Sequence, residues 1–124
     1  MEVAAIRPGE RPIIDSYGDG GFRVSGERIE GSVLVLPDRT ESWPVTTMDG
    51  LGPEILSPVT ATDPPIEILL LGCGERMTLV PAALKAHLRE IGIAVEPMDT
   101  GAACRTYNVL LSEHRRVAAA LIAV

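Results

Sequence analysis

The sequence predicts an α/β domain in which a mixed sheet joins an N-terminal antiparallel β-meander to a C-terminal β-α-β-α-β parallel unit. Two observations predict this fold class. The first half of the chain consists of short apolar segments separated by glycine-containing turns, whereas the second half alternates apolar runs with amphipathic segments. A chain of 124 residues is long enough for one core. We therefore expect a single domain over 1–124, with 1–12 as a flexible N-terminal segment.

The N-terminal half is expected to form hairpins. Its extended segments are 13–17, 22–24, 28–30 and 32–36. Gly20 and Gly21 supply the positive φ angles that a tight turn between the first two segments demands. A further extended segment is expected at 43–45. Pro53 can begin a single helical turn over 52–56.

The C-terminal half begins with a continuous apolar run at 67–72, which is typical of a strand covered on both faces. A helix is expected over 81–91, because Leu84, Leu88 and Ile91 recur at helical spacing. Gly92 then ends that helix in a left-handed conformation. The next strand is expected at 93–96.

Asp99 or Thr100 is expected to cap a second helix. The predicted apolar stripe of this helix consists of Ala103, Tyr107, Leu110, Leu111 and His114. After Arg116, the last segment 116–124 is apolar on every side, and two interpretations stand: a buried helix, favoured by alanine propensity, or a strand. We favour the strand, because it completes three neighbouring parallel strands with right-handed crossovers.

Composition disfavours several classes of function. The chain has 11 basic and 17 acidic residues and a net charge of −6. This balance argues against nucleic acid and anionic membrane surfaces, which basic proteins bind. No apolar run reaches the length needed to cross a bilayer, so no direct membrane insertion is expected. The start of the chain lacks the features of a secretory signal, and a cytoplasmic protein is expected. Neither the two cysteines nor the two histidines have zinc-ligand spacing, so we expect no metal and no cofactor.

Two segments are expected at the carboxyl ends of the parallel strands, where ligands collect in open α/β sheets. One is Gly72-Cys73-Gly74-Glu75-Arg76, and the other is Asp99-Thr100-Gly101-Ala102-Ala103-Cys104-Arg105. Their glycines, helix N-terminus and arginines could hold a carboxylate or phosphate. The plainer interpretation is that small residues only let the chain turn. The candidate ligand- or anion-binding residues are Gly72, Cys73, Gly74, Arg76, Thr100, Cys104, Arg105 and Asn108.

The thiols and the tryptophan each allow two interpretations. Cys104 lies in the first turn of its helix, where the helix dipole would lower its pKa, but it can equally pack as a small apolar side chain beside Leu111. A redox pair of Cys73 and Cys104 is conceivable, because both predicted loops share one sheet edge. Trp43 is expected to plug the open edge of the sheet or to anchor a partner, and we favour the plug.

The sequence also resembles a known family over about residues 12–123. The segments that carry the resemblance are Ile14-Asp15-Ser16-Tyr17-Gly18, Gly21-Phe22, Gly31-Ser32, Pro37, Trp43, Leu70-Leu71-Gly72-x-Gly74, Pro81, Gly92-Ile93, Met98-Asp99-Thr100 and Ala102-Ala103-Cys104-Arg105-Thr106-Tyr107-Asn108. They resemble the domain-of-unknown-function family that includes the mitochondrial complex I assembly factor three and the adipogenesis-associated Mth-domain protein, with this chain as a bacterial member.

The resemblance implies a three-layer α/β fold with the tail as a strand. It implies no established catalytic activity, and it implies protein contacts during complex I assembly, often beside a second assembly factor. Family members more usually have Gly-Thr-Gly at 72–74, which weakens a shared redox role for Cys73. The candidate surface that the family carries over consists of Gly72, Gly74, Thr100, Cys104, Arg105, Tyr107 and Asn108.

Two functions are therefore expected, one as the alternative to the other. The first is a non-enzymatic interaction module that assists assembly of a membrane-associated complex through a protein partner. The second is a small-molecule or anion binder, with enzymatic activity left open, that uses the strand-end cleft. A homodimer through an exposed sheet edge is also conceivable.

Overall fold

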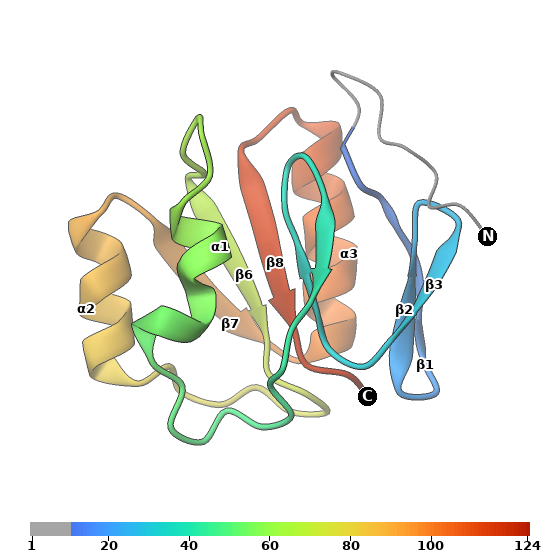
Figure 1. Cartoon of the computed structure of the whole chain (residues 1–124), viewed down its shortest axis with the longest axis horizontal. Coiled ribbons are helices and arrows are strands. Elements are labelled where there is room, and N and C mark those ends of the chain that lie inside the picture. Colours follow the sequence, from blue (N-terminus) through green and yellow to red (C-terminus); the bar gives the residue numbers. More distant parts are fainter. Residues whose placement is uncertain (1–10) are drawn as a thin grey trace.

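The computed structural model describes residues 11–124. Most of the predicted flexible segment 1–12 therefore lies outside the described residues. The elements are β1 (Ile14–Gly18), β2 (Gly21–Val24), β3 (Glu27–Glu30), β4 (Val33–Val35), β5 (Thr40–Ser42), the 3-10 helix η1 (Pro53–Leu56), α1 (Ser57–Thr60), β6 (Ile68–Gly72), α2 (Ala82–Glu90), β7 (Ala94–Met98), α3 (Thr100–Ser112) and β8 (Val117–Leu121) (Figure 1). Within the described part of the chain, no helix is both long and apolar enough to cross a membrane.

The strands form two sheets, and the predicted fold class is confirmed. Strands β1, β2 and β3 form an antiparallel sheet, and the other five have the order β5-β4-β8-β6-β7. Strand β6 pairs in parallel with β7 and β8, whereas β4 is antiparallel to β8 and β5. The predicted meander thus divides after β3. All three residues of β4 are buried, unlike those of β3, so β4 needs cover on both faces, which the central sheet provides.

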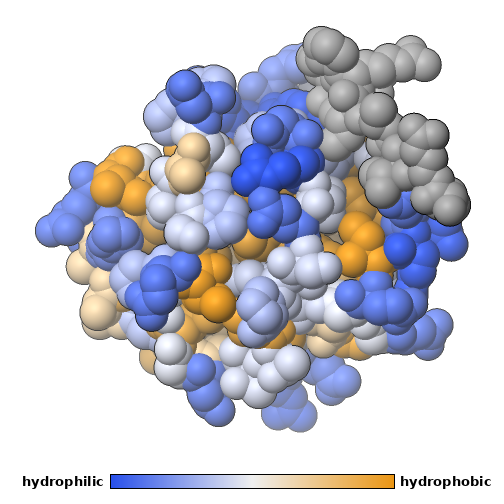
Figure 2. Space-filling view, in the orientation of Figure 1, coloured by the Kyte–Doolittle hydropathy of each residue, from blue (hydrophilic) through white to orange (hydrophobic). Residues whose placement is uncertain are grey.

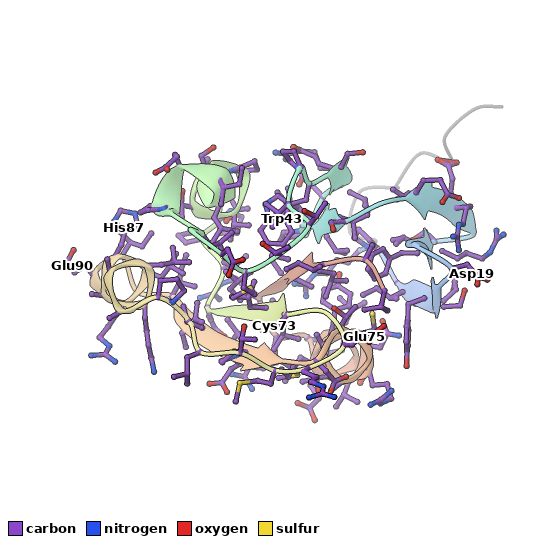
Figure 3. All side chains as sticks on the ribbon, turned by 90° about the horizontal axis from the view of Figure 1, so that it is seen from below. Asp19, Trp43, Cys73, Glu75, His87 and Glu90 are labelled. Atoms are coloured by element: carbon purple, nitrogen blue, oxygen red, sulfur yellow. The ribbon has the colours of Figure 1, made fainter. Side chains whose placement is uncertain are left out.

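The molecule has three layers around the five-stranded sheet. One face carries η1, α1 and α2, and the other carries α3, beside which the β1–β3 sheet packs (Figure 3). Alternate residues of β6 supply the two cores, because side chains alternate across a strand. Leu69 and Leu71 belong to the core under α2, and Leu70 belongs to the core under α3.

The tail is a strand, as favoured from the sequence. Strand β8 pairs with β4 on one side and with β6 on the other, and all five of its residues are buried. Ala118 and Ala120 pack in the core under α2, while Ala119 packs in the core under α3. Pairing on both sides therefore overrides the helix propensity of alanine.

Some local predictions are wrong, and the choice left open for Trp43 is resolved in favour of packing. The extended segment expected at 43–45 lies earlier, as β5. Trp43 follows β5 and is buried, and its indole N–H donates to the carbonyl of Ile55 at 3.0 Å, so it packs rather than anchors a partner. Ile91 and His114 are exposed, because α2 and α3 end before them and helical spacing no longer directs their side chains inward.

Candidate functional site at the ends of the parallel strands

The two predicted loops lie side by side, as expected. The backbone N–H of Thr100 donates to the carbonyl of Gly74 at 2.8 Å. The Thr100 hydroxyl accepts from the Gly74 N–H at 3.0 Å and donates to the carbonyl of Ile122 at 2.7 Å. Thr100 is fully buried. Its side chain therefore fills the space between the loop after β6, the segment after β8 and the start of α3.

Gly72 allows this close packing. A Cβ built at Gly72 would lie 2.9 Å from Cδ2 of Leu121 and 3.1 Å from Cα of Thr100. The first distance is shorter than real Cβ contacts, and the second is tighter than most of them, so the neighbouring atoms would have to shift. Gly72 is thus explained by the approach of α3 to the end of β6.

The N-terminus of α3 is capped by its own chain. Oδ1 of Asp99 accepts a hydrogen bond from the backbone N–H of Ala102 at 2.9 Å. This resolves the predicted choice of cap: Asp99 is the N-cap, while Thr100 joins the strand ends. A carboxylate already occupies the place that an anion would take at a free helix N-terminus.

Arg105 contacts β1 rather than the loop after β6. Its guanidinium donates to the hydroxyl of Tyr17 at 3.1 Å. The Tyr17 ring lies over Gly101, where a Cβ would be 2.5 Å from the hydroxyl oxygen. Arg105 is exposed, and so is Arg76 in the loop after β6. Helix α3 therefore contacts Tyr17 through two of its residues: the ring packs against Gly101, and the hydroxyl accepts a hydrogen bond from Arg105.

Tyr107 and Asn108 bind the start of the N-terminal sheet. The Tyr107 hydroxyl donates to the carbonyl of Pro12 at 2.8 Å, and burial raises the pKa of this phenol. The Asn108 amide accepts from the N–H of Ile14 at 3.1 Å and donates to its carbonyl at 2.7 Å. Segment 98–108 is therefore the link between the central sheet and β1.

The two thiols are buried and separated from each other. Both cysteines are free and buried. Cys73 belongs to the core under α2 and Cys104 to the core under α3, so they lie on opposite faces of the sheet, and the redox pair is wrong. Burial raises the pKa of Cys104 to about 12, against a smaller lowering by Arg105. The packing interpretation of Cys104 is therefore favoured, because desolvation of the buried thiol outweighs the attraction of Arg105 for a thiolate.

An open hollow of about 380 Å³ lies at the ends of β6 and β8. It is lined by Thr46, Thr47, Met48, Asp49, Cys73, Gly74, Glu75, Thr78, Ile122, Ala123 and Val124. Among the predicted residues, only Cys73 and Gly74 line it. Its charged side chains, Asp49 and Glu75, are acidic (Glu75 and Cys73 are labelled in Figure 3).

Sequence reasoning missed the segment 46–49, which forms one wall of this hollow. No strand or helix contains these residues, so no periodic pattern marked them. Among residues 11–124, no group of three or more His, Cys, Asp or Glu side chains is placed to hold a metal ion.

Proteins of similar sequence are found in animals and in bacteria. The chain is 38% identical over 109 residues to the NADH dehydrogenase (ubiquinone) 1 alpha subcomplex assembly factor 3 of Xenopus tropicalis. The matched region covers 88% of this chain and 60% of that protein. It is also 38% identical over 109 residues to an uncharacterized protein of Rhodobacter capsulatus, covering 88% of this chain and 82% of that protein. The chain thus spans about three fifths of the length of the assembly factor.

Solved structures share the fold. The crystal structure described as an outer membrane protein from Bartonella henselae superposes with a TM-score of 0.86 at 40% identity, covering 92% of this chain and 96% of that one. The solution structure of a Mth938-like domain from Bordetella pertussis has a TM-score of 0.80 at 28% identity, covering 98% and 92%. The family described as protein of unknown function (DUF498/DUF598) matches residues 14–122. The resemblance predicted from the sequence is therefore confirmed, and this chain belongs to the DUF498/DUF598 family.

Proposed function

We propose that this protein is a non-enzymatic interaction module that assists the assembly of a membrane-associated complex, in the manner that the name of its mitochondrial relatives describes. The observation that carries the proposal is the 38% identity to an assembly factor over 88% of this chain. By the same kinship, the client is a subunit or intermediate of a bacterial respiratory NADH dehydrogenase. The module acts in the cytoplasm, where cysteines stay reduced. Its two cysteines are free and buried, which agrees with that compartment.

The side chains of segment 98–108 support a role without catalysis. Asp99, Thr100 and Asn108 bond to backbone groups of the same molecule, and Arg105 bonds to Tyr17. These bonds explain segment 98–108 as a connection between the layers of the fold. Its side chains are held by the fold rather than directed together at a reacting group.

The loop at 75–81 offers the contact surface. Its side chains Met77 and Leu79 are 54% and 85% exposed, whereas Val80 packs against the core under α2. The view of Figure 2 shows the apolar surface of the molecule as separate patches set among polar side chains. Two large apolar side chains in one loop, next to the hollow that Thr78 lines, form a small anchor of the kind that partners bury.

The test is site-specific photo-crosslinking in the native host, with the photoreactive residue at position 79. The matched control carries it at position 109, because Val109 is also exposed but lies on α3. We expect a crosslinked subunit or assembly intermediate of the NADH dehydrogenase from position 79 and not from position 109. Leu79→Asp should abolish the crosslink made from position 77. The absence of such a product from either loop position would refute the proposal.

The hollow supports a second candidate, a binder of small molecules. The presence of predicted residues Cys73 and Gly74 in its wall favours this function. Because Asp49 and Glu75 are its charged side chains, a neutral or cationic ligand suits it better than an anion. Amide shifts on titration with a primary amine, compared with inorganic phosphate, test this. Shifts of Gly74 and Glu75 with the amine, lost in Glu75→Gln, would support the binder. Shifts with phosphate that Arg105→Ala removes would support the anion site instead.

A further inference from the structure

Among residues 11–124, no strand pairs with the outer edge of β7, which ends one side of the five-stranded sheet. Within the described residues β7 pairs with β6 only. The N–H of Ala94 donates to the carbonyl of Glu67 at 2.9 Å, and the carbonyl of Met98 accepts from the N–H of Cys73 at 2.8 Å. Because alternate residues of a parallel strand bond to the same neighbour, residues 94, 96 and 98 face β6. The backbone groups of Val95 and Pro97 consequently face outward.

The presence of proline at position 97 is consistent with an outward-facing backbone at this residue. Proline has no N–H, and in sheets it occupies edge positions where no donor is needed. The outward edge of β7 therefore offers three groups: the N–H and the carbonyl of Val95 and the carbonyl of Pro97. One donor and two acceptors can bind an added strand, while the missing donor limits indiscriminate pairing.

A groove of about 440 Å³ runs along this edge between α2 and β7. It is lined by Lys85, Arg89, Gly92, Ile93, Ala94, Val95 and Glu96. Lys85 and Arg89 come from α2, and neither forms an ion pair with an acidic side chain of residues 11–124. The groove thus carries two basic groups against the single carboxylate of Glu96, on a protein whose net charge is −6.

We propose that the outer edge of β7 binds an extended acidic segment of a partner protein, which joins the central sheet as a sixth strand. This inference rests on the proposed function as an interaction module and names the chemistry of the partner. Main-chain bonds to Val95 and Pro97 hold the segment, and Lys85 and Arg89 select carboxylates on the side chains that face α2.

A second copy of this chain fits the edge less well. In an antiparallel pair of β7 strands, a two-fold axis perpendicular to the sheet would place both α2 helices on the same face. The Lys85 and Arg89 side chains of the two copies would then approach each other, and like charges repel. The same charges attract an acidic strand. Charge complementarity therefore decides between the two occupants.

The test uses the whole chain and a short, end-capped peptide of alternating valine and glutamate. Titration followed by nuclear magnetic resonance should shift the Val95 amide and slow its exchange with solvent. The same peptide with lysine in place of glutamate should bind at least about fivefold more weakly. N-methylation of the peptide nitrogens that face β7 should abolish binding, whereas N-methylation of the other nitrogens should not. Equal binding of the glutamate and lysine peptides, or of both N-methylated forms, would overturn the proposal.

Variants locate the site. Lys85→Gln with Arg89→Gln should weaken binding of the glutamate peptide about fivefold, since each exposed ion pair contributes modestly. Arg76→Gln is the matched control and should change it by less than about twofold, because Arg76 lies in the loop after β6. Pro97→Val supplies the missing N–H and should tighten binding about threefold. Unchanged affinity in both the glutamine double variant and Pro97→Val would contradict the inference. The inference would also be contradicted if the protein sedimented as a dimer and its Val95 amide were already protected from exchange with solvent.

The same double variant separates this inference from the proposed function. If position 79 still crosslinks its partner equally in Lys85→Gln, Arg89→Gln cells while the peptide fails to bind the wild type, the interaction module stands and the β7 inference fails. If the peptide binds at β7 but no assembly partner is crosslinked from the 75–81 loop, the inference about the edge stands and the proposed function fails.

Discussion

Asn108 acts as a substitute for a neighbouring strand. Its side-chain amide has the same donor and acceptor as a peptide group, and it bonds both to the N–H and to the carbonyl of Ile14. These two bonds satisfy the part of β1 that faces α3. A side chain that looks like a polar position on a helix surface therefore completes a sheet.

Replacement of Asn108 should consequently loosen β1. In Asn108→Ala the backbone groups of Ile14 lose both partners, and we expect the free energy of unfolding to fall by about 1–2 kcal/mol. Urea denaturation measures the change. Ser112→Ala is the control on the same helix, because the Ser112 hydroxyl only bonds to the carbonyl of Val109 at the surface, and it should change stability by less than about 0.5 kcal/mol. Equal effects of the two substitutions would contradict this role.

Thr100 is a second residue whose hydroxyl has a structural task. Thr100→Val keeps the shape but leaves the buried Gly74 N–H and Ile122 carbonyl without their partner. We expect a loss of about 2–3 kcal/mol in the free energy of unfolding. Thr100→Ser keeps the hydroxyl and removes one methyl group, so its loss should be about 1 kcal/mol. A serine variant as unstable as the valine variant would show that the methyl group, rather than the hydroxyl, matters.

Cys104 makes stability depend on alkaline pH. Its pKa is raised to about 12 by burial, whereas the thiol of the unfolded chain titrates near its ordinary pKa of 9.0. Between these values the unfolded state loses a proton that the folded state keeps. The stabilisation is complete below pH 9 and is lost as pH rises towards 12, at about 1.4 kcal/mol per unit for one proton.

The measurement is urea denaturation at a series of pH values above 8. Cys104→Ala should reduce the alkaline slope, while Cys73→Ala serves as the control for the loss of a thiol. Tyr107 contributes to the slope with the same sign, because burial raises its pKa as well. An unchanged slope in Cys104→Ala would mean that the folded thiol titrates normally.

At the scale of elements, α3 is held at both of its surfaces. It packs on β6 and β8 on one side and contacts β1 on the other. Gly72 lies where α3 approaches the end of β6, and Gly101 lies where α3 approaches Tyr17 of β1. The atoms that an added side chain would contact differ between the two positions. At Gly72 the neighbours include the backbone of Thr100, whereas at Gly101 they are atoms of the exposed Tyr17 ring.

Alanine at these two glycines should therefore have unequal effects. Gly72→Ala should lower the free energy of unfolding by about 1–3 kcal/mol, because the backbone cannot give way without moving α3. In Gly101→Ala the Tyr17 ring can swing outward, and the gain in helix propensity of up to about 1 kcal/mol offsets the lost contact. Thermal denaturation compares them. A larger loss at Gly101 would show that Tyr17 is fixed more firmly than its exposure indicates.

At the scale of the whole molecule, the two sheets differ in how they are supported. Strand β8 is buried and paired on both sides, whereas the β1–β3 sheet is joined to the rest through Phe22, Val24, Ile14 and the bonds from α3. Local opening is easiest where few buried contacts hold an element. The central sheet is thus the more persistent unit.

Hydrogen exchange should reveal this order. We expect the amides of β6 and β8 to exchange only with global unfolding and those of β2 and β3 to exchange faster. Asn108→Ala should speed exchange in β1 and β2 more than in β8. Equal acceleration in both sheets would indicate a single cooperative unit.

The sequence by itself determined most of the elements and the parallel unit, because hydrophobic period and glycine position act locally. Leu84, Leu88 and Gly92 defined α2 and its end, and the apolar runs at 67–72 and 116–124 defined two covered strands. Only the tertiary structure decided that β4 leaves the meander, that Thr100 closes the gap between the predicted loops, and that Asn108 and Arg105 serve β1. These outcomes depend on which backbone groups remain unpaired once the layers meet, and no pattern within one segment specifies its distant partner.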